Sequence, residues 1–209
     1  SKPFAENINL LNSNKKLKNF ISINIGNELS TVSLCQDSSL VFFKTFPFGS
    51  NSIYNDINQL CSLSKNEAKI VIENLDNNKS TYIDKKFFIN SDYKKLSLNH
   101  FKEIINARVK EMIDYTFNNN KDINYYEKKI GKINIFFEDI NIYTNLGEIF
   151  KKYIDVKDVK ILVENFTYND FGTLYGAAEL IFKGWPNEAL PLSIKKKSII
   201  SGFFDRFFS

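Results

Sequence analysis

The first part of the chain alternates apolar and polar positions, the period of two that is typical of strands. Between 20 and 34, every second residue from Ile21 to Ile25 is isoleucine, and a polar break then precedes a second apolar alternation. We therefore expect a strand, a tight turn and a second strand. A third strand is expected at 40–48, where a proline and a glycine end the apolar run.

Later segments repeat their apolar residues with the period of a helix. The clearest one is opened by Ser97 and has one apolar face over about five turns. Ser64, three residues before Glu67, forms a capping box in front of a further helix. The segment 79–96 is polar and is expected to be a poorly ordered strand or loop. The other expected helices lie at 3–11, 51–61, 146–153 and 172–182, and further strands lie at 132–137 and 159–163.

The order of these elements is three strands, helices, strand, helix, strand and helix, which predicts an α/β fold with a mixed sheet and a helical insertion. In the last of these helices Gly172, Gly176 and Ala177 lie on one side. Because such residues are small, we expect another backbone to approach this helix closely.

The end of the chain has a different pattern. At about 100° per residue, the large apolar residues of 198–209 share one half of a helix and the polar residues share the other. We expect an amphipathic helix on an anionic membrane surface, because lysines precede the apolar face. The alternative is a terminal helix docked on its own domain. The expected membrane-binding residues are Lys195, Lys196, Lys197, Ile199, Ile200, Phe203, Phe204, Phe207 and Phe208.

Composition narrows the function classes. The 209 residues are 43% hydrophobic with a net charge of +4, which supplies a core and argues against disorder. The lysines are scattered among acids, so no nucleic-acid partner is expected. Cys35 and Cys61 match no metal spacing, and we expect buried thiols in a reducing compartment. His100 is the only histidine and lies at a helix start, so no catalytic residue and no metal site are expected.

Four stretches carry a resemblance to a known family: ISINIGNELSTVSL, PFGSNSIYNDI, LNHFKEIINARVKEMI and FGTLYGAAELIFKG. They resemble, in order, a strand and Asp-x-Gly-Gly-Gly-Thr-Thr turn, a Val-Gly-Gly-Asn-x-Ile-Thr-x-Asp-Ile helix start, an Arg-Val-x-Glu-Ile helix and a final fold helix. These are features of the FtsA family of bacterial cell-division proteins, which are actin-like ATPases. The second match is more specific than the first.

The resemblance implies the second lobe of an actin-like (ribonuclease H-like) fold. Residues 1–54 and 130–185 would form subdomain 2A, and 55–129 would form the inserted helical subdomain 2B. Residues 186–197 would be a linker and 198–209 the membrane-targeting helix. The chain would then be the C-terminal half of a longer protein whose first lobe lies upstream.

The resemblance also implies a nucleotide site with ATP and Mg²⁺, to which Gly26, Ser30, Gly49 and Asn51 would contribute. The chain departs from the family pattern at several points. Asn24 replaces the aspartate that organises the metal ion, and the residues after Gly26 replace two glycines and a threonine. The second glycine pair is replaced by Glu138 and Asp139, and Lys69 and Ile72 stand where a glutamate and a lysine are usual. These changes favour a lobe that no longer binds ATP well, and we do not expect an enzyme.

The function implied by the resemblance is a membrane adaptor of the bacterial division ring. It would tether filaments of the tubulin-like protein FtsZ to the cytoplasmic face of the inner membrane at the septum, and the full-length protein would self-associate into filaments. The C-terminal peptide of FtsZ would dock on the insertion, where the basic candidates are Lys65, Lys69, Lys102 and Arg108. Internal pairing is the alternative role for Arg108. The alternative functions are an ATP-binding polymerising actin-like ATPase and a pilus-assembly actin-like protein.

Overall fold

The computed structural model describes residues 2–13, 18–75, 80–121, 123, 130–156, 159–165 and 169–184. The predicted linker and membrane helix, and with them every predicted membrane-binding residue, lie outside these described residues. No helix in the described ranges is long and apolar enough to span a bilayer.

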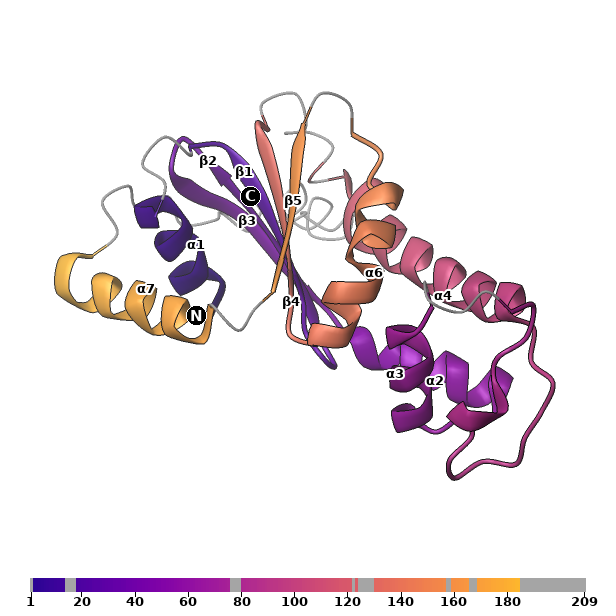
Figure 1. Cartoon of the computed structure of the whole chain (residues 1–209). Helices are drawn as coiled ribbons and strands as arrows, with labels where there is room; N and C mark the ends of the chain where they lie inside the picture. Colours follow the sequence, from indigo (N-terminus) through magenta and orange to yellow (C-terminus); the bar gives the residue numbers. More distant parts are fainter. Residues whose placement is uncertain are drawn as a thin grey trace, which may run out of the picture.

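A mixed five-stranded sheet forms the centre of the molecule (Figure 1). Its order is β3-β2-β1-β4-β5, with β1 antiparallel to β2, β2 antiparallel to β3, and β1, β4 and β5 parallel to one another. This confirms the predicted α/β fold with a mixed sheet. The strands are β1 (Phe20–Ile25), β2 (Ser30–Gln36), β3 (Ser39–Phe46), β4 (Lys132–Phe137) and β5 (Lys160–Asn165).

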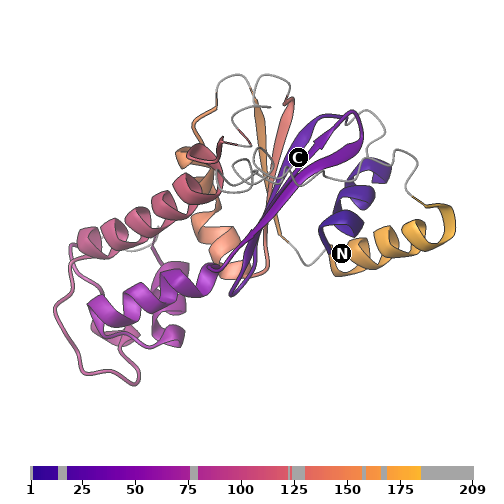
Figure 2. The same ribbon diagram turned by 180° about the vertical axis from the view of Figure 1, so that it is seen from behind.

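Helices cover both faces of the sheet (Figures 1 and 2). On one face α6 (Ile140–Tyr153) packs against β4 and β5, and α4 (Leu98–Ile113) packs against α6. On the other face α1 (Lys2–Ser13) packs against β2 and β3, and α7 (Asn169–Lys183) packs along α1. The close approach predicted for the last helix is confirmed at Gly176, where a Cβ would lie 1.8 Å from the carbonyl oxygen of Ala5.

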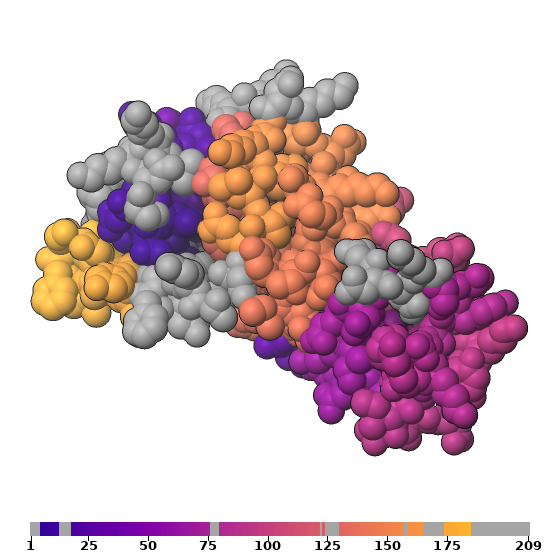
Figure 3. All heavy atoms as spheres, in the orientation of Figure 1, coloured from indigo at the N-terminus to yellow at the C-terminus, as the bar shows by residue number. Residues whose placement is uncertain are grey.

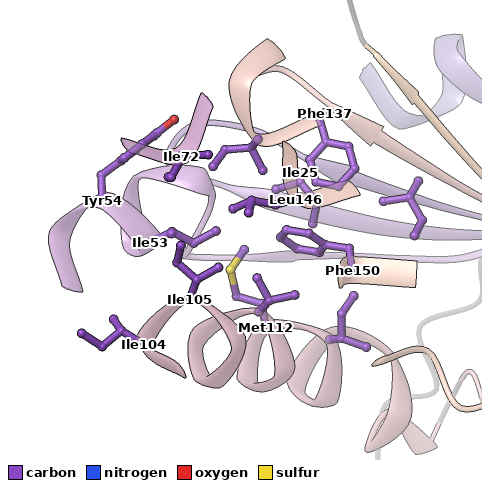
Figure 4. Packing of buried hydrophobic residues seen from close by; sticks show 14 of the residues in the cluster. Ile25, Ile53, Tyr54, Ile72, Ile104, Ile105, Met112, Phe137, Leu146 and Phe150 are labelled. Atoms are coloured by element: carbon purple, nitrogen blue, oxygen red, sulfur yellow. The ribbon is translucent and has the colours of Figure 1, made fainter. Parts of the chain in front are cut away.

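The inserted helices α2 (Ser50–Cys61) and α3 (Lys65–Glu73) project from the sheet together with α4. Figure 4 shows how their apolar faces meet: Ile53 of α2, Ile105 of α4 and Leu146 of α6 belong to one continuous core that reaches Ile25 and Phe137 of the sheet. The boundary between two subdomains therefore crosses a shared core, and the proposed division at 54/55 and 129/130 stays a prediction.

Three elements differ from the sequence expectations. Helix α6 begins at Ile140 instead of 146, because Asp139 caps it by accepting hydrogen bonds from the amides of Asn141 and Ile142. The long helix is regular only to Ile113 and continues as a π-helical segment, η2 (Asp114–Asn118). The hydroxyl of Thr116 bonds to the carbonyl of Met112 at this point, a contact that bends helices.

The third difference is the segment 80–97, most of which lies in the stretch 79–96 that the sequence predicts to be a poorly ordered strand or loop. It contains a short 3₁₀ turn, η1 (Lys85–Phe87), and buries Ile83 and Phe87. Buried Glu67 fixes it by accepting hydrogen bonds from the amides of Asn90 and Ser91, at 2.8 and 2.9 Å, and from the Ser91 hydroxyl at 2.6 Å. One buried carboxylate therefore helps to order a segment whose sequence is mainly polar.

The same carboxylate completes the predicted capping box of α3, accepting from the amide and hydroxyl of Ser64, both at 2.7 Å. Burial raises the pKa of Glu67, but the hydrogen bonds from Ser91, Ser64 and Asn90 outweigh burial and hold the pKa well below its usual range. The ionised form is thus the one that the fold requires.

We expect Glu67→Gln to lower the free energy of unfolding by about 1–3 kcal/mol, because an amide cannot accept from all these donors. Because its pKa is lower in the folded state, the Glu67 carboxylate contributes its full stabilisation at pH values above the unfolded-state pKa of about 4.3. This stabilisation is lost as the pH falls below that unfolded-state pKa. Urea unfolding at successive pH values should show a shallower acid loss for Glu67→Gln than for wild type. Exposed Glu103→Gln on α4 is the matched control; equal stability of the two variants would contradict this role.

Candidate functional site

The turn between β1 and β2 is the segment that the resemblance assigns to phosphate. The amide of Gly26 donates to the carbonyl of Leu29 at 2.9 Å and closes the turn. In the family that the chain resembles, glycines at this place allow a turn with positive φ, which other residues rarely adopt. Among the described residues, positive φ occurs at Asp37, Ser38, Ser62 and Gly184, none of which is in this turn. The chain has therefore adopted a different turn, one that its residues form without strain.

The first residues of α2 lie directly on this turn. The amide of Ser50 donates to the carbonyl of Gly26 at 2.9 Å, and the amide of Asn51 donates to the carbonyl of Asn27 at 3.0 Å. Gly49 makes this approach possible, since a Cβ there would lie 2.3 Å from the Gly26 carbonyl oxygen. A helix N-terminus binds phosphate through its free amides, and here two of those amides already have partners.

Two carboxylates lie at the same turn. Glu138 accepts hydrogen bonds from the backbone amide of Asn27 at 2.9 Å and from its side chain at 3.2 Å. Glu28 accepts from the side-chain amide of Asn51, whose carbonyl oxygen accepts from Lys65. Negative charges at this position repel a phosphate group, so the turn does not fit the phosphates of ATP.

The four predicted nucleotide-binding residues are close together, but each has an internal role. Gly26, Gly49 and Asn51 join the turn to α2 as described. Ser30 is buried, and its hydroxyl donates to the carbonyl of Phe48 at 2.8 Å. The structure thus gathers these residues, and the donors of Gly26, Ser30 and Asn51 are used within the protein.

Asn24, at the family's metal-organising position, is buried and donates to the carboxylate of Glu6 on α1 at 2.5 Å. Sequence reasoning missed Glu6, although it is the only acid in the first helix and lies between buried Ala5 and Ile8. A carboxyl group from another element therefore faces Asn24. No group of three His, Cys, Asp or Glu that could hold a metal ion occurs within the described ranges.

Glu138 and Asp139, which replace the family's second glycine pair, follow β4, and the side chain of Asp139 is an internal one. Its carboxylate is buried, caps α6 and accepts a hydrogen bond from the hydroxyl of Tyr54 at 3.0 Å. Burial raises the pKa of Tyr54, and the charge and hydrogen bond of Asp139 raise it further. The Lys69 ammonium lies 3.9 Å from Asp139 and 5.7 Å from the centre of the Tyr54 ring. Lys65 also lies over this ring, at 5.2 Å.

Arg108 joins two inserted helices. Its guanidinium donates to both carboxylate oxygens of Asp56 on α2, at 2.5 and 2.8 Å, and to Glu111 at 2.7 Å. The hydrogen bond to Asp56 raises the pKa of Arg108. This is the internal pairing that the sequence left as the alternative to partner binding. Lys102, in contrast, is exposed on the first turns of α4.

The segment 80–97 presents a basic and aromatic surface that sequence reasoning missed. Lys95 lies 4.3 Å from the centre of the Tyr82 ring, and Lys85 lies 5.9 Å from that of Tyr93. Both tyrosines are partly exposed, and Ile89 between them is exposed. The signal in the sequence was the interleaving of lysine with tyrosine and phenylalanine, which was interpreted only as polarity.

No protein-family model and no curated protein matches the chain. Solved structures do match it. The ethanolamine utilization protein EutJ from Carboxydothermus hydrogenoformans has a TM-score of 0.57 at 11% identity over 84% of this chain and 53% of its own. The apo psk41 ParM protein has a TM-score of 0.53 at 13% identity over 86% of this chain and 47% of its own. MreB 5 of Spiroplasma citri, bound to AMPPNP, has a TM-score of 0.49 at 11% identity, with 84% and 57% covered.

The chain therefore spans about half the length of these proteins. EutJ and ParM are actin-like proteins, and the common feature is the fold: a mixed sheet with helices on both faces and a helical insertion. The chain has the actin-like fold.

Proposed function

We propose that this protein is a membrane adaptor that uses an actin-like lobe as a docking body and not as a nucleotide-driven motor. The observation that carries the proposal is the closed turn at Gly26. The first amides of α2 donate hydrogen bonds to the carbonyl groups of this turn, and Glu28 and Glu138 place negative charge beside it. A lobe with such a turn performs its function through its surface. The amphipathic pattern of 198–209 supplies one binding surface, for anionic lipid of the inner membrane.

The shape of the lobe suits an adaptor. Helix α7, from which the chain continues to the tail, and the inserted helices α2 and α3 are at opposite ends of the molecule (Figures 1 and 3). A chain attached to a membrane beyond α7 can thus present its insertion to a second partner. Many tails on one filament would bind far more firmly than one tail through avidity.

The proposed partner is the acidic C-terminal peptide of FtsZ, in keeping with the resemblance to the FtsA family. Of the four predicted basic residues, Lys65, Lys69 and Arg108 have internal partners, and Lys102 is exposed. We therefore assign peptide binding to Lys102 and to the basic and aromatic surface of 80–97. Cations with exposed rings and Ile89 suit a peptide that combines acidic and apolar groups.

A charge-reversal experiment tests this assignment. Lys95→Glu with Lys102→Glu should weaken binding of a synthetic FtsZ C-terminal peptide about tenfold or more, measured by fluorescence anisotropy. Lys44→Glu with Lys160→Glu is the matched control, because it makes the same charge change on the sheet and Lys44 also lies over an aromatic ring. Equal weakening by both pairs, or by neither, would contradict the docking surface.

The main alternative is an ATP-binding, polymerising actin-like ATPase, and a pilus-assembly actin-like protein is a further one. We expect isothermal titration of Mg-ATP into the full-length protein to give no saturable heat below about 1 mM, because the donors for phosphate in this lobe are already paired. Micromolar affinity would overturn our preference and favour the ATPase. Binding of ATP would leave the membrane proposal to be judged by vesicle experiments.

A further inference from the structure

Helix α7 carries a continuous apolar stripe that faces away from the protein. Leu174, Tyr175, Ile181 and Phe182 have exposed fractions of 66%, 69%, 80% and 84%. They form two pairs spaced seven residues apart, which places all four on one side of a helix. Gly176, on the opposite side, is buried against Ala5 of α1. Figures 1 and 2 show α7 as the outermost helix here, with α1 between it and the sheet.

A stripe of this kind is costly to leave in water. Single exposed apolar residues are ordinary, but a contiguous group of large ones marks a binding surface. The charged residues Glu179 and Lys183 of α7 pair with each other and do not interrupt the four apolar side chains. The surface therefore fits an apolar helix face and not a charged peptide.

The chain itself contains a segment with such a face. Residues 198–209 have isoleucine and phenylalanine on one half of a helix. The intervening residues 184–197 number 14 and can extend up to about 50 Å, whereas α7 is about 22 Å long. The segment can therefore lie along α7 in either direction. Because it is tethered, its effective concentration at α7 is in the millimolar range.

We propose that residues 198–209 dock on the exposed stripe of α7 when no membrane is present. The regulatory consequence of this docking rests on the proposed membrane function, because the same phenylalanines cannot contact lipid and α7 at once. Docking therefore opposes membrane attachment, and a membrane must displace the segment from α7. This contact keeps two apolar faces out of water and regulates attachment by competition.

A disulfide cross-link in the full chain tests the contact directly. Ala178 lies at the middle of the α7 stripe and Phe203 lies near the middle of the tail stripe, so Ala178→Cys and Phe203→Cys meet in either helix direction. Cys35 and Cys61 are buried and stay out of the reaction. Mild oxidation should give a cross-linked monomer that anionic vesicles suppress. Lys102→Cys with Phe203→Cys, with the first cysteine on the inserted helix α4, is the control and should give none.

Other outcomes overturn the proposal. A cross-linked dimer would mean that a second copy covers α7, and the absence of a cross-link would mean that the tail does not dock there. Vesicle binding adds a second measurement: Ile181→Glu with Phe182→Glu should raise vesicle affinity about threefold or more by removing the competitor. Unchanged or reduced affinity contradicts the competition. If neither wild type nor variant binds vesicles, the membrane function fails, and the cross-link still decides the docking.

Discussion

Phe203→Glu combined with Phe207→Glu should abolish binding to anionic vesicles, with a loss of affinity of more than about 100-fold. Burying six large apolar side chains at a membrane yields on the order of 9 kcal/mol gross, and partial depth and helix ordering reduce this by about half. Two carboxylates in the middle of the stripe remove that contribution and repel anionic lipid. Co-sedimentation with vesicles measures the loss.

The matched control makes the same charge change on the other side of the helix. Ser201→Glu with Ser209→Glu adds two carboxylates to the polar half of the tail, and vesicle affinity should fall only several-fold through charge repulsion. All variants should stay folded and keep a cooperative thermal transition. If the phenylalanine variant unfolds instead, the tail is part of the core and the membrane assignment is wrong.

Gly49→Ala should lower the free energy of unfolding by about 2–3 kcal/mol, as overpacking does. The added Cβ would lie 2.3 Å from the carbonyl oxygen of Gly26 and 2.6 Å from the backbone of Asn27, so α2 would have to move off the turn. The backbone at Gly49 is extended, so the cost comes from contact and not from φ. Urea unfolding measures it.

Gly131→Ala is the matched control, because its Cβ would meet only the Asn19 carbonyl oxygen at 3.8 Å, an ordinary contact. We expect its stability to be within about 1 kcal/mol of wild type. If Gly49→Ala is as stable as Gly131→Ala, α2 is not seated on the turn, and the explanation for weak nucleotide binding loses its basis.

The strands and most helices could be predicted from the sequence because their periodicity is local. Every second residue of β1 faces the core shared with α4 and α6, and the apolar face of α4 repeats with the helical period. The capping box at Ser64 is confirmed for the same reason: its partner is three residues away. Such signals depend only on the local sequence.

The errors have a common cause in contacts between distant parts of the chain. The start of α6 depends on Asp139, whose position is fixed by Tyr54 in another helix. The order of 80–97 depends on Glu67, and the environment of Asn24 depends on Glu6. A single polar residue gives no periodic signal, so a hydrogen-bond partner far away in the sequence cannot be inferred from residue spacing. For the same reason the sequence did not reveal the internal partners of Lys65 and Lys69, whereas internal pairing was already the stated alternative for Arg108.

The candidate site shows both sides of this limit. The turn at Gly26 and the helix start at Gly49 were both recognisable in the sequence, and the structure places Gly26, Ser30, Gly49 and Asn51 close together. Their role in nucleotide binding stays a prediction. The sequence could not show that the first amides of α2 donate hydrogen bonds to the carbonyl groups of the turn. That closure is a tertiary contact, and it is the feature that separates a docking lobe from a nucleotide-driven one in our proposal.

The most direct measurement is co-sedimentation of the wild-type chain with anionic and with neutral vesicles, each with and without Mg-ATP. Our account predicts binding to anionic vesicles, several-fold weaker binding to neutral ones, and no effect of ATP. Absence of binding to anionic vesicles, or binding that requires ATP, would contradict the account.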